Sequence, residues 1–345
     1  MSSTSTHNRS KVLIIHDNRI GHLNPALAVS EMIEKRFYLQ SEQFAIPTLP
    51  KRTVSVFKKL SHFPNLFRTL GRLYFKFLPR NLEHTDVIVC SGMPNLIYAA
   101  YLSQRFNIPL IYAGGTRKFN WRLIDWTITT IPEDHSGRQI IIPTGAVPSK
   151  ITRLAHIPSN HEACLLIGGP TKEYPFTHQD FEEMIQQFVQ FADHHQIQAS
   201  VVCSRRTPAL SEHVIQMLKD KNIELVNTYS KTSICDVLKR SEYIFVTEDS
   251  ATMLSESIQT GRIVISICRE YSEKDEIIQN YLDLELIQRK TIGQITEAAY
   301  IKPKLNAQHI EQIVTQQLAE DLRAKSQELS FYKCHLCTRQ KKITH

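Results

Sequence analysis

Long apolar runs are missing from this sequence of 345 residues, and no segment approaches the roughly 20 apolar residues that a membrane-spanning helix needs. The first ten residues are polar and lack the apolar stretch of a secretory signal. The seven cysteines are odd in number and scattered, which indicates free thiols in a reducing compartment rather than a disulfide framework. We therefore expect a cytoplasmic protein.

Short repeats and low-complexity segments are also missing after the first ten residues. The composition, 42% apolar and 22% charged, is typical of a globular protein. A chain of this length exceeds one ordinary core and suits two domains of about 150 residues each. The net charge of +7 is small for this length, so the placement of the charges is more informative than their sum.

Short apolar runs alternate with helical patterns along most of the chain. Many runs are rich in valine and isoleucine without clean polar alternation, as expected of strands covered on both faces. We expect strands at 11–16, 86–91, 110–113, 126–130, 140–143, 163–167, 198–203, 223–226, 242–247 and 263–267. We expect helices at 25–35, 96–105, 180–194, 211–220, 233–240, 252–259 and 307–325. This alternation is typical of parallel βαβ units.

A turn-rich region at 143–160 interrupts the alternation, and a second series of strands and helices begins at Ala163. The sequence thus predicts an α/β protein with two Rossmann-like domains, at 11–155 and 156–330. A disordered tail at 1–10 and a C-terminal tail at 331–345 would flank them. The long helix after Asn306 could lie across both domains.

Ligands of open parallel sheets bind where strands end and helices begin, and the first such junction runs from His16 to Pro25. Gly21 permits a tight turn there. His22 could act as a general base, because histidine side chains are suited to proton transfer near neutral pH. Pro25 suits the first turn of a helix. A capped helix with a solvent-facing histidine explains the same residues.

Two junctions of the second series carry glycine and arginine. Gly168 and Gly169 follow an apolar strand and would let a ligand approach the backbone, although such a pair is more often only a turn. Ser204, Arg205, Arg206 and Thr207 follow the next strand. Because the guanidinium fork matches phosphate oxygens, the arginines suit a diphosphate; the alternative is a pair of surface arginines.

The fourth junction joins the apolar strand ending near Thr247 to a helix that Asp249 or Ser250 can cap. Free N–H groups at that helix N-terminus would favour a phosphate. Glu256, near the second turn, could bind a ribose diol. Gly261 suits the helix end. Capping alone explains Ser250 but leaves Glu256 on a helix of mostly small residues without an explanation.

Together these junctions resemble the Elm-type family, which is named for a plant mitochondrial fission protein and is widespread among bacterial candidate glycosyltransferases. The resemblance lies in 17–28, 131–135, 143–146, 166–171, 204–208 and 246–261. The first junction is also similar to the N-terminal loop of the transferase that makes lipid II, another enzyme of GT-B fold. The chain departs from the Elm-type pattern at Asn18, where the family has glycine, and at Pro25, where it has glutamine.

The resemblance implies two Rossmann-like domains facing a cleft, as in the GT-B fold, with a nucleotide-sugar donor on the second domain and an acceptor on the first. Acceptor-side residues would be Arg19, Gly21 and Asn24, with His22 or Asp17 as the catalytic base. Donor-side residues would be Gly168, Gly169, Ser204, Arg205, Arg206, Thr207, Thr247, Asp249, Ser250, Met253 and Glu256. No Asp-x-Asp stands in a suitable loop, so we expect transfer without a metal and without a resident cofactor.

A basic stretch at 51–80 holds eight lysines and arginines, six aromatic residues and no acidic residue. Its apolar positions give a roughly helical face. Such a helix can lie on anionic lipid, which would place the protein peripherally on the inner face of a membrane. The alternative is a helical pair packed on the sheet with a solvated basic face. No nucleic-acid-binding pattern accompanies the charge, so we expect no nucleic-acid partner.

Three functions fit these features. The first is a glycosyltransferase that moves a sugar from a nucleotide-diphosphate-sugar to a cell-surface glycan or lipid-linked acceptor. The second is a non-catalytic Elm-type interaction protein of membrane or mitochondrial organisation, and the third is a sugar-nucleotide epimerase. A structural zinc site needs four ligands. The lone Cys334-His-Leu-Cys337 at the C-terminus could find the extra ones in His335 and His345, but we read it as incidental.

Overall fold

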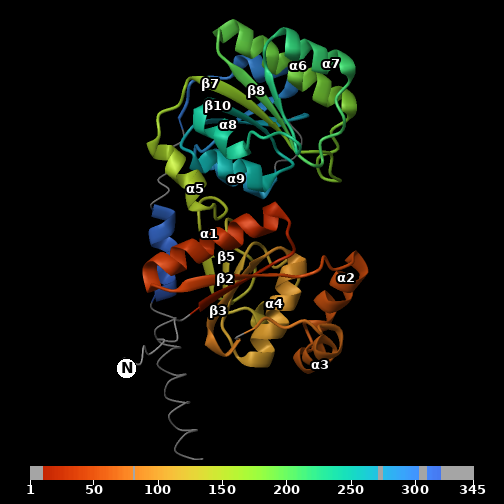
Figure 1. Cartoon of the computed structure of the whole chain (residues 1–345), viewed down its shortest axis with the longest axis vertical. Coiled ribbons are helices and arrows are strands. Elements are labelled where there is room, and N and C mark those ends of the chain that lie inside the picture. The colour runs from red at the N-terminus through yellow and green to blue at the C-terminus, as the bar shows by residue number, and fades with distance from the viewer. Residues whose placement is uncertain (1–10, 81, 271–274, 303–308, 320–345) are drawn as a thin grey trace, which may run out of the picture.

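The computed structural model describes residues 11–80, 82–270, 275–302 and 309–319. Cys334 and Cys337 and both predicted tails lie outside these residues. The described chain forms two α/β domains, each built on a six-stranded parallel sheet, one above the other in Figure 1. No helix within the described part of the chain is both long and apolar enough to cross a membrane.

The first sheet has the strand order β2-β1-β3-β4-β5-β6. Its strands are β1 (Lys11–His16), β2 (Gln40–Ala45), β3 (Thr85–Ser91), β4 (Leu110–Ala113), β5 (Trp126–Thr129) and β6 (Gln139–Ile141). Its helices are α1 (Ile20–Phe37), α2 (Lys51–Leu60), α3 (Pro64–Tyr74) and α4 (Met93–Phe106). Alternate residues of β1 pack on opposite faces of the sheet, Leu13 with α4 and Val12 with α1, which explains its continuous apolar run.

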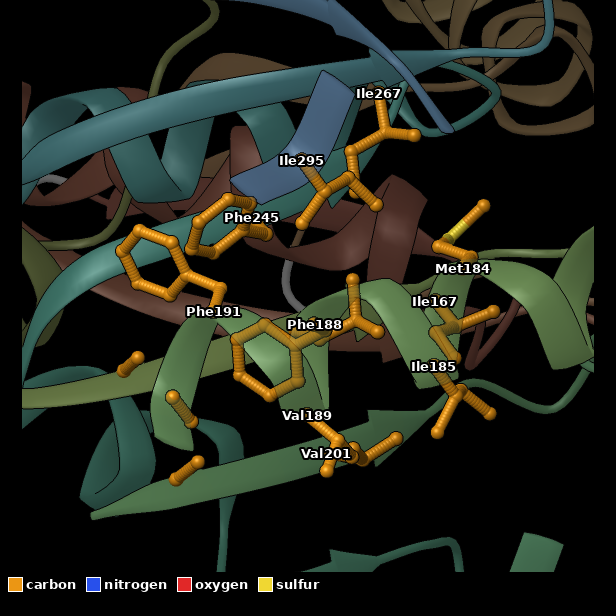
Figure 2. Packing of buried hydrophobic residues seen from close by; sticks show 14 of the residues in the cluster. Ile167, Met184, Ile185, Phe188, Val189, Phe191, Val201, Phe245, Ile267 and Ile295 are labelled. Atoms are coloured by element: carbon orange, nitrogen blue, oxygen red, sulfur yellow. The ribbon is translucent and has the colours of Figure 1, made fainter. Parts of the chain in front are cut away.

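The second sheet has the order β12-β11-β10-β7-β8-β9. Its strands are β7 (Glu162–Ile167), β8 (Ala199–Cys203), β9 (Glu224–Val226), β10 (Ser241–Thr247), β11 (Ile263–Cys268) and β12 (Gln288–Thr291). Its helices are α6 (His178–His195), α7 (Glu212–Asp220), α8 (Ile234–Arg240), α9 (Ala251–Gln259) and α10 (Glu276–Asp283), and α5 (Ser149–Thr152) precedes the sheet. Figure 2 shows one of its cores, where Phe188 and Phe191 of α6 pack beside Phe245 of β10.

The ten expected strands are all present, with bounds that differ from the predicted ones by up to two residues. Two strands were missed, β2 and β12, and both lie at the outer edge of a sheet, where a strand has one neighbour and its residues are largely polar. The helix predicted to begin at Pro25 begins instead at Ile20, so that Pro25 lies inside α1. Because proline has no backbone N–H, Pro25 removes only one backbone hydrogen bond near the start of α1.

The helical residues 309–319 lie beside α1 (Figure 1), and their Ile310, Val314 and Leu318 are buried in the core of the first sheet. Lys35 of α1 also pairs with Glu311 at 2.7 Å. Although the predicted boundaries assign this segment to the second domain, its apolar side chains therefore pack with the first.

Helices α2 and α3 form the helical pair expected in the basic stretch, and they are anchored on α4. Gly71 of α3 makes this close approach possible, because a Cβ there would lie less than 3.0 Å from the buried ring of Tyr101. Phe57 and Phe67 meet edge to face at 5.9 Å between ring centres, and Phe75 lies 5.4 Å from Tyr101.

We expect Gly71→Ala to lower the free energy of unfolding by about 1–2 kcal/mol, because crowding against Tyr101 outweighs the better helix propensity of alanine. Urea denaturation followed by circular dichroism measures this. The control is Gly293→Ala, where the new Cβ meets nothing within 4 Å and stability should be unchanged or slightly higher. Equal effects of both changes would contradict the packing argument.

Candidate functional site

Three turns of the second domain meet because their strands are neighbours in the order β10-β7-β8. The N–H of Gly168, after β7, donates to Thr247 Oγ1 at 2.8 Å. The N–H of Gly169 donates to Asp249 Oδ2 at 2.9 Å. From the third turn, Ser204 Oγ donates to the Gly168 carbonyl at 2.6 Å. The structure therefore brings the predicted donor-side residues of three separate segments into one network.

Glycine is required at both positions after β7. A Cβ at Gly168 would lie less than 3.0 Å from the Asp249 carboxylate, and one at Gly169 less than 3.0 Å from the Arg206 carbonyl. The hydroxyl of Thr207 lies within 2.8 Å of the Ile167 carbonyl and accepts from the Ser204 N–H. The pair thus serves close packing of neighbouring turns, and both of its N–H groups already have acceptors within the protein.

The two arginines after β8 have different environments. Arg206 Nη2 lies 2.6 Å from Asp249 Oδ2, and this ion pair joins the turns after β8 and β10. Arg205 is exposed and forms no ion pair with any residue that the structure describes. Of these two arginines, Arg205 is therefore the one that remains free for an anionic ligand.

The Asp249 side chain is completely buried although it carries a charge. Its Oδ2 has two donors, Gly169 and Arg206, while Oδ1 has no hydrogen-bond partner among the described residues. A buried carboxylate oxygen without a donor is costly, so this turn has an unused acceptor.

Glu248 and Arg289 form a buried ion pair that the sequence did not indicate. Arg289 donates through Nε at 2.7 Å and Nη2 at 2.8 Å to the two carboxylate oxygens, and Ser266 Oγ donates a third bond at 3.0 Å. The bonds to Glu248 raise the pKa of Arg289. This pair holds the turn after β10 in place, because Glu248 lies in that turn and Arg289 lies on β12. It was missed because Arg289 belongs to the unexpected edge strand β12.

Helix α9 begins at the predicted turn, with Ser250 Oγ 3.5 Å from the N–H of Met253. Met253 is partly buried against the core beneath the helix. Glu256, one turn further, is only 5% exposed and accepts a hydrogen bond from Asn24 Nδ2 at 2.6 Å. Burial raises the pKa of Glu256, and the Asn24 bond and Lys150 partly oppose that shift. A ribose-binding role for Glu256 stays a prediction, and the structure gives it a protein partner.

In the first domain, His22 of α1 lies beside Asp17, which follows β1. His22 Nδ1 is 3.0 Å from Asp17 Oδ1, and the Asp17 side chain is fully buried whereas the His22 side chain is 26% exposed. Arg19 Nε lies 3.5 Å from Asp17 Oδ2. An ionised carboxylate only accepts, so Nδ1 carries the proton and the other ring nitrogen, Nε2, is left as an acceptor.

The His22 ring rests on Gly92, the residue between β3 and α4. A Cβ at Gly92 would lie less than 3.0 Å from His22 Cγ, and the Gly92 φ of 83° is in the region that favours glycine. Sequence reasoning missed Gly92 because its partner lies seventy residues away, with no local pattern to mark the contact.

The N-terminal parts of α1 and α9 face each other across the domain junction. A Cβ at Gly21 would lie 3.6 Å from Thr252 Oγ1, and Asn24 bonds Glu256 as described. The segment between β6 and α5, which contains Gly145, is held by Ser255 of α9, whose Oγ accepts from the Gly145 N–H at 3.2 Å. Asn24 of the predicted acceptor side therefore meets Glu256 of the predicted donor side, although the roles of both stay predictions.

A cavity of about 600 Å³ lies elsewhere at the junction and is lined by parts of α1 and α5 and by Gln259 and Glu311. None of the predicted site residues lines it.

The burial of Glu256 predicts that the free energy of unfolding depends on pH. The pKa of Glu256 is raised in the folded protein, so protonated Glu256 makes its full contribution to the free energy of unfolding below the ordinary glutamate pKa. This contribution is lost as the pH rises through the folded-state pKa. Glu256→Gln keeps an acceptor for Asn24 and removes the charge. We expect the variant to exceed the wild type in free energy of unfolding at neutral pH, with the difference vanishing toward pH of about 4.

Urea denaturation at several pH values measures this difference. The control Glu183→Gln removes an exposed carboxylate on α6 and should show no such pH dependence. A Glu256→Gln protein that is less stable than the wild type at neutral pH would contradict the interpretation.

Comparison with known proteins gives one family. The model of the mitochondrial fission ELM1 family matches residues 142–318, just over half of the chain. The match covers the turns after β7, β8 and β10, whereas the turn with Asp17 and His22 lies outside it. No curated protein matches the sequence.

Three solved structures of similar fold are of proteins named for, or solved with, UDP or a UDP-sugar. A candidate UDP-N-acetylglucosamine 2-epimerase from Listeria monocytogenes aligns with a TM-score of 0.57 at 10% identity, covering 92% of this chain and 97% of that one. Arabidopsis thaliana UGT89C1 complexed with UDP-L-rhamnose gives 0.51 at 10% identity, with 92% and 94% covered. S. aureus MnaA with UDP gives 0.50 at 11% identity, with 88% and 90% covered.

At such low identity these likenesses establish the fold, two Rossmann-like domains of GT-B type, as the sequence predicted. The family match and the fold agree. The chain belongs to the mitochondrial fission ELM1 family.

Proposed function

We propose that this protein is a glycosyltransferase that moves a sugar from a nucleotide-diphosphate-sugar to a glycan or lipid-linked acceptor. One observation carries the proposal: the start of α9 in the second domain lies against Gly21 of the first, next to the His22–Asp17 pair, since a Cβ at Gly21 would lie 3.6 Å from Thr252 Oγ1. A cationic phosphate site and a histidine with a free ring nitrogen are the two parts that sugar transfer needs.

The names of the structural neighbours support a nucleotide-sugar ligand. S. aureus MnaA was solved with UDP and Arabidopsis thaliana UGT89C1 with UDP-L-rhamnose. The ligand we propose for the second domain here is of the same chemical class. It would bind at the carboxyl ends of β7, β8 and β10, where open parallel sheets bind ligands.

On the donor side, Arg205 would contact the diphosphate, because its guanidinium is the one not already paired. The N-terminus of α9 would hold a phosphate with its free N–H groups. Arg206 and Asp249 would position these groups rather than contact the phosphate. Glu256 would bind the ribose after exchanging its bond to Asn24. These charges would stabilise the leaving diphosphate without a metal.

On the acceptor side, His22 would take the proton of the acceptor hydroxyl through Nε2. Asp17 would hold the ring in the required tautomer and stabilise the imidazolium that forms. Its complete burial makes direct contact with the acceptor unfavourable, so we assign it the positioning role.

A non-catalytic interaction protein is the second candidate. It is favoured by the internal partners of Asp249, Arg206 and Glu256, which make the junction self-contained. An epimerase is the third, since a candidate epimerase shares the fold. Ligand binding and product analysis separate the three.

We expect UDP, GDP, CMP or ADP to raise the melting temperature, because a ligand that binds only the folded state stabilises it. Arg205→Ala should weaken binding of the effective nucleotide at least about tenfold, as loss of a charged hydrogen bond to phosphate does. The control Arg36→Ala removes an exposed arginine of α1 and should leave binding unchanged. A folded protein that binds none of the four nucleotides would contradict the proposal.

We expect His22→Gln to reduce kcat by a factor of about 10²–10⁴ while nucleotide affinity stays near that of the wild type, since the base acts on the acceptor. Turnover is followed by nucleotide release with and without an acceptor. An epimerised sugar nucleotide in the absence of acceptor would identify the third function. Nucleotide binding without turnover in any acceptor mixture would favour the second.

A further inference from the structure

The helical pair α2–α3 has one face in the core and another face that no described residue covers. Fifteen large apolar side chains are exposed among the described residues, and seven of them belong to the thirty residues 51–80. Phe63, Leu73 and Phe77 are each about two-thirds exposed, at 65%, 67% and 67%. Exposed apolar residues are normally scattered, so this concentration indicates a surface that meets something.

The exposed apolar side chains form a row on α3. Phe63, Leu66 and Leu73 follow at spacings of three and seven residues, which places them on one side of the helix, whereas Leu70 between them packs partly against the core. Phe67, Gly71 and Phe75 occupy the side that packs against α4. The exposed row is therefore distinct from the packing side and is not needed to hold α3 in place.

Cations flank this row without any acidic residue. Seven of the eight lysines and arginines in 51–80 are exposed, and none forms an ion pair with a described residue. Arg68 and Arg72 follow each other by one helical turn beside the row. The surface thus combines apolar side chains with uncompensated positive charge.

A loop from another part of the chain adds two more cations. Asn120 donates from its N–H to Ser61 Oγ at 2.9 Å and from Nδ2 to the Ser61 carbonyl at 2.8 Å, which holds the loop against the end of α2. Arg117 and Lys118, both exposed, precede it with φ of 48° and 68°. Burial and the charges of Arg117 and Lys118 lower the pKa of Lys58, one turn before Ser61.

Two consecutive residues other than glycine in left-handed conformation are unfavourable, and so is a group of like charges. The loop is nevertheless fixed from both ends, because Thr116 donates to Glu133 through its N–H at 2.6 Å and through Oγ1 at 2.7 Å. The protein therefore holds three cations together at the base of the apolar row.

We propose that this basic apolar face, formed by the exposed side chains of 51–80 with Arg117 and Lys118, docks on an anionic phospholipid bilayer. The apolar row would insert among the acyl chains near the headgroups, and the cations would pair with lipid phosphates. Charge complementarity selects this occupant, since the segment 51–80 with Arg117 and Lys118 carries nine exposed cations and no acidic residue. The proposal does not depend on the proposed transferase activity.

Vesicle sedimentation tests the proposal with the full chain. The probes are vesicles of phosphatidylcholine and phosphatidylserine at about three to one and vesicles of pure phosphatidylcholine. We expect binding to the anionic vesicles that falls with added salt, and binding at least about tenfold weaker to the neutral vesicles. Equal binding to both, or to neither, would overturn the proposal.

Two variants locate the surface. Arg68→Glu with Arg72→Glu, and separately Leu66→Ser with Leu73→Ser, should each weaken anionic-vesicle binding at least about tenfold. The matched control for the first is Lys219→Glu with Lys231→Glu, which reverses two exposed charges of the second domain and should weaken binding far less. Equal loss in the control would show a general charge effect and contradict the assignment.

A second copy of the chain is the competing occupant. Sedimentation velocity without lipid decides it: a concentration-dependent dimer that Leu66→Ser with Leu73→Ser abolishes would overturn the bilayer proposal. A wild type that stays monomeric and binds anionic vesicles supports it. Circular dichroism and urea denaturation check that each variant remains folded, so that loss of vesicle binding is not loss of structure.

Discussion

The buried carboxylate of Asp249 is the contact through which three separate turns of the second domain take their positions. It accepts from the backbone of Gly169 after β7, pairs with Arg206 after β8, and itself follows β10. A charge without solvent is unfavourable unless donors surround it, so each of these turns must stay where it supplies its bond. Moving any one of them would take a hydrogen bond or the ion pair away from the buried charge, which makes the arrangement cooperative.

The same constraint explains why one arginine of the pair is free. Arg206 is used to neutralise Asp249, whereas Arg205, its neighbour in sequence, is exposed. A sequence pattern with two adjacent arginines treats them as equivalent ligands for a diphosphate. The structure separates them into a positioning residue and a residue that can meet a ligand, because adjacent side chains of a turn leave in different directions.

The sequence predicted the interior of the fold better than its edges. Buried strands such as β7 and β10 are continuous apolar runs, because helices cover both faces of each sheet. Two of the four edge strands, β2 and β12, have largely polar residues that are exposed or only partly buried, and they gave no such signal. Because β12 was not predicted, Arg289 and its ion pair with Glu248 were not predicted either.

Contacts between distant segments were the other limit. The predicted glycines, arginines and α9 residues were found from local patterns after strands, which parallel topology gathers at one edge. The seating of His22 on Gly92 and the bond from Asn24 to Glu256 could not be predicted, since each joins residues far apart in sequence. Such contacts depend on how helices are placed on the sheet, which hydrophobic periodicity does not specify.

Parallel topology also relates the two surfaces of the first domain. Asp17 follows β1, helix α2 begins shortly after β2, and the loop with Arg117 and Lys118 follows β4. Because these strands run in the same direction, all three segments leave the sheet on one side, at the carboxyl ends of its strands. The basic apolar face is therefore built on the same side as the His22–Asp17 pair. If that face meets a bilayer, a lipid-linked acceptor would come to the domain from the side on which the proposed base lies. Lipid binding and acceptor access would then both depend on the segments that follow β1, β2 and β4.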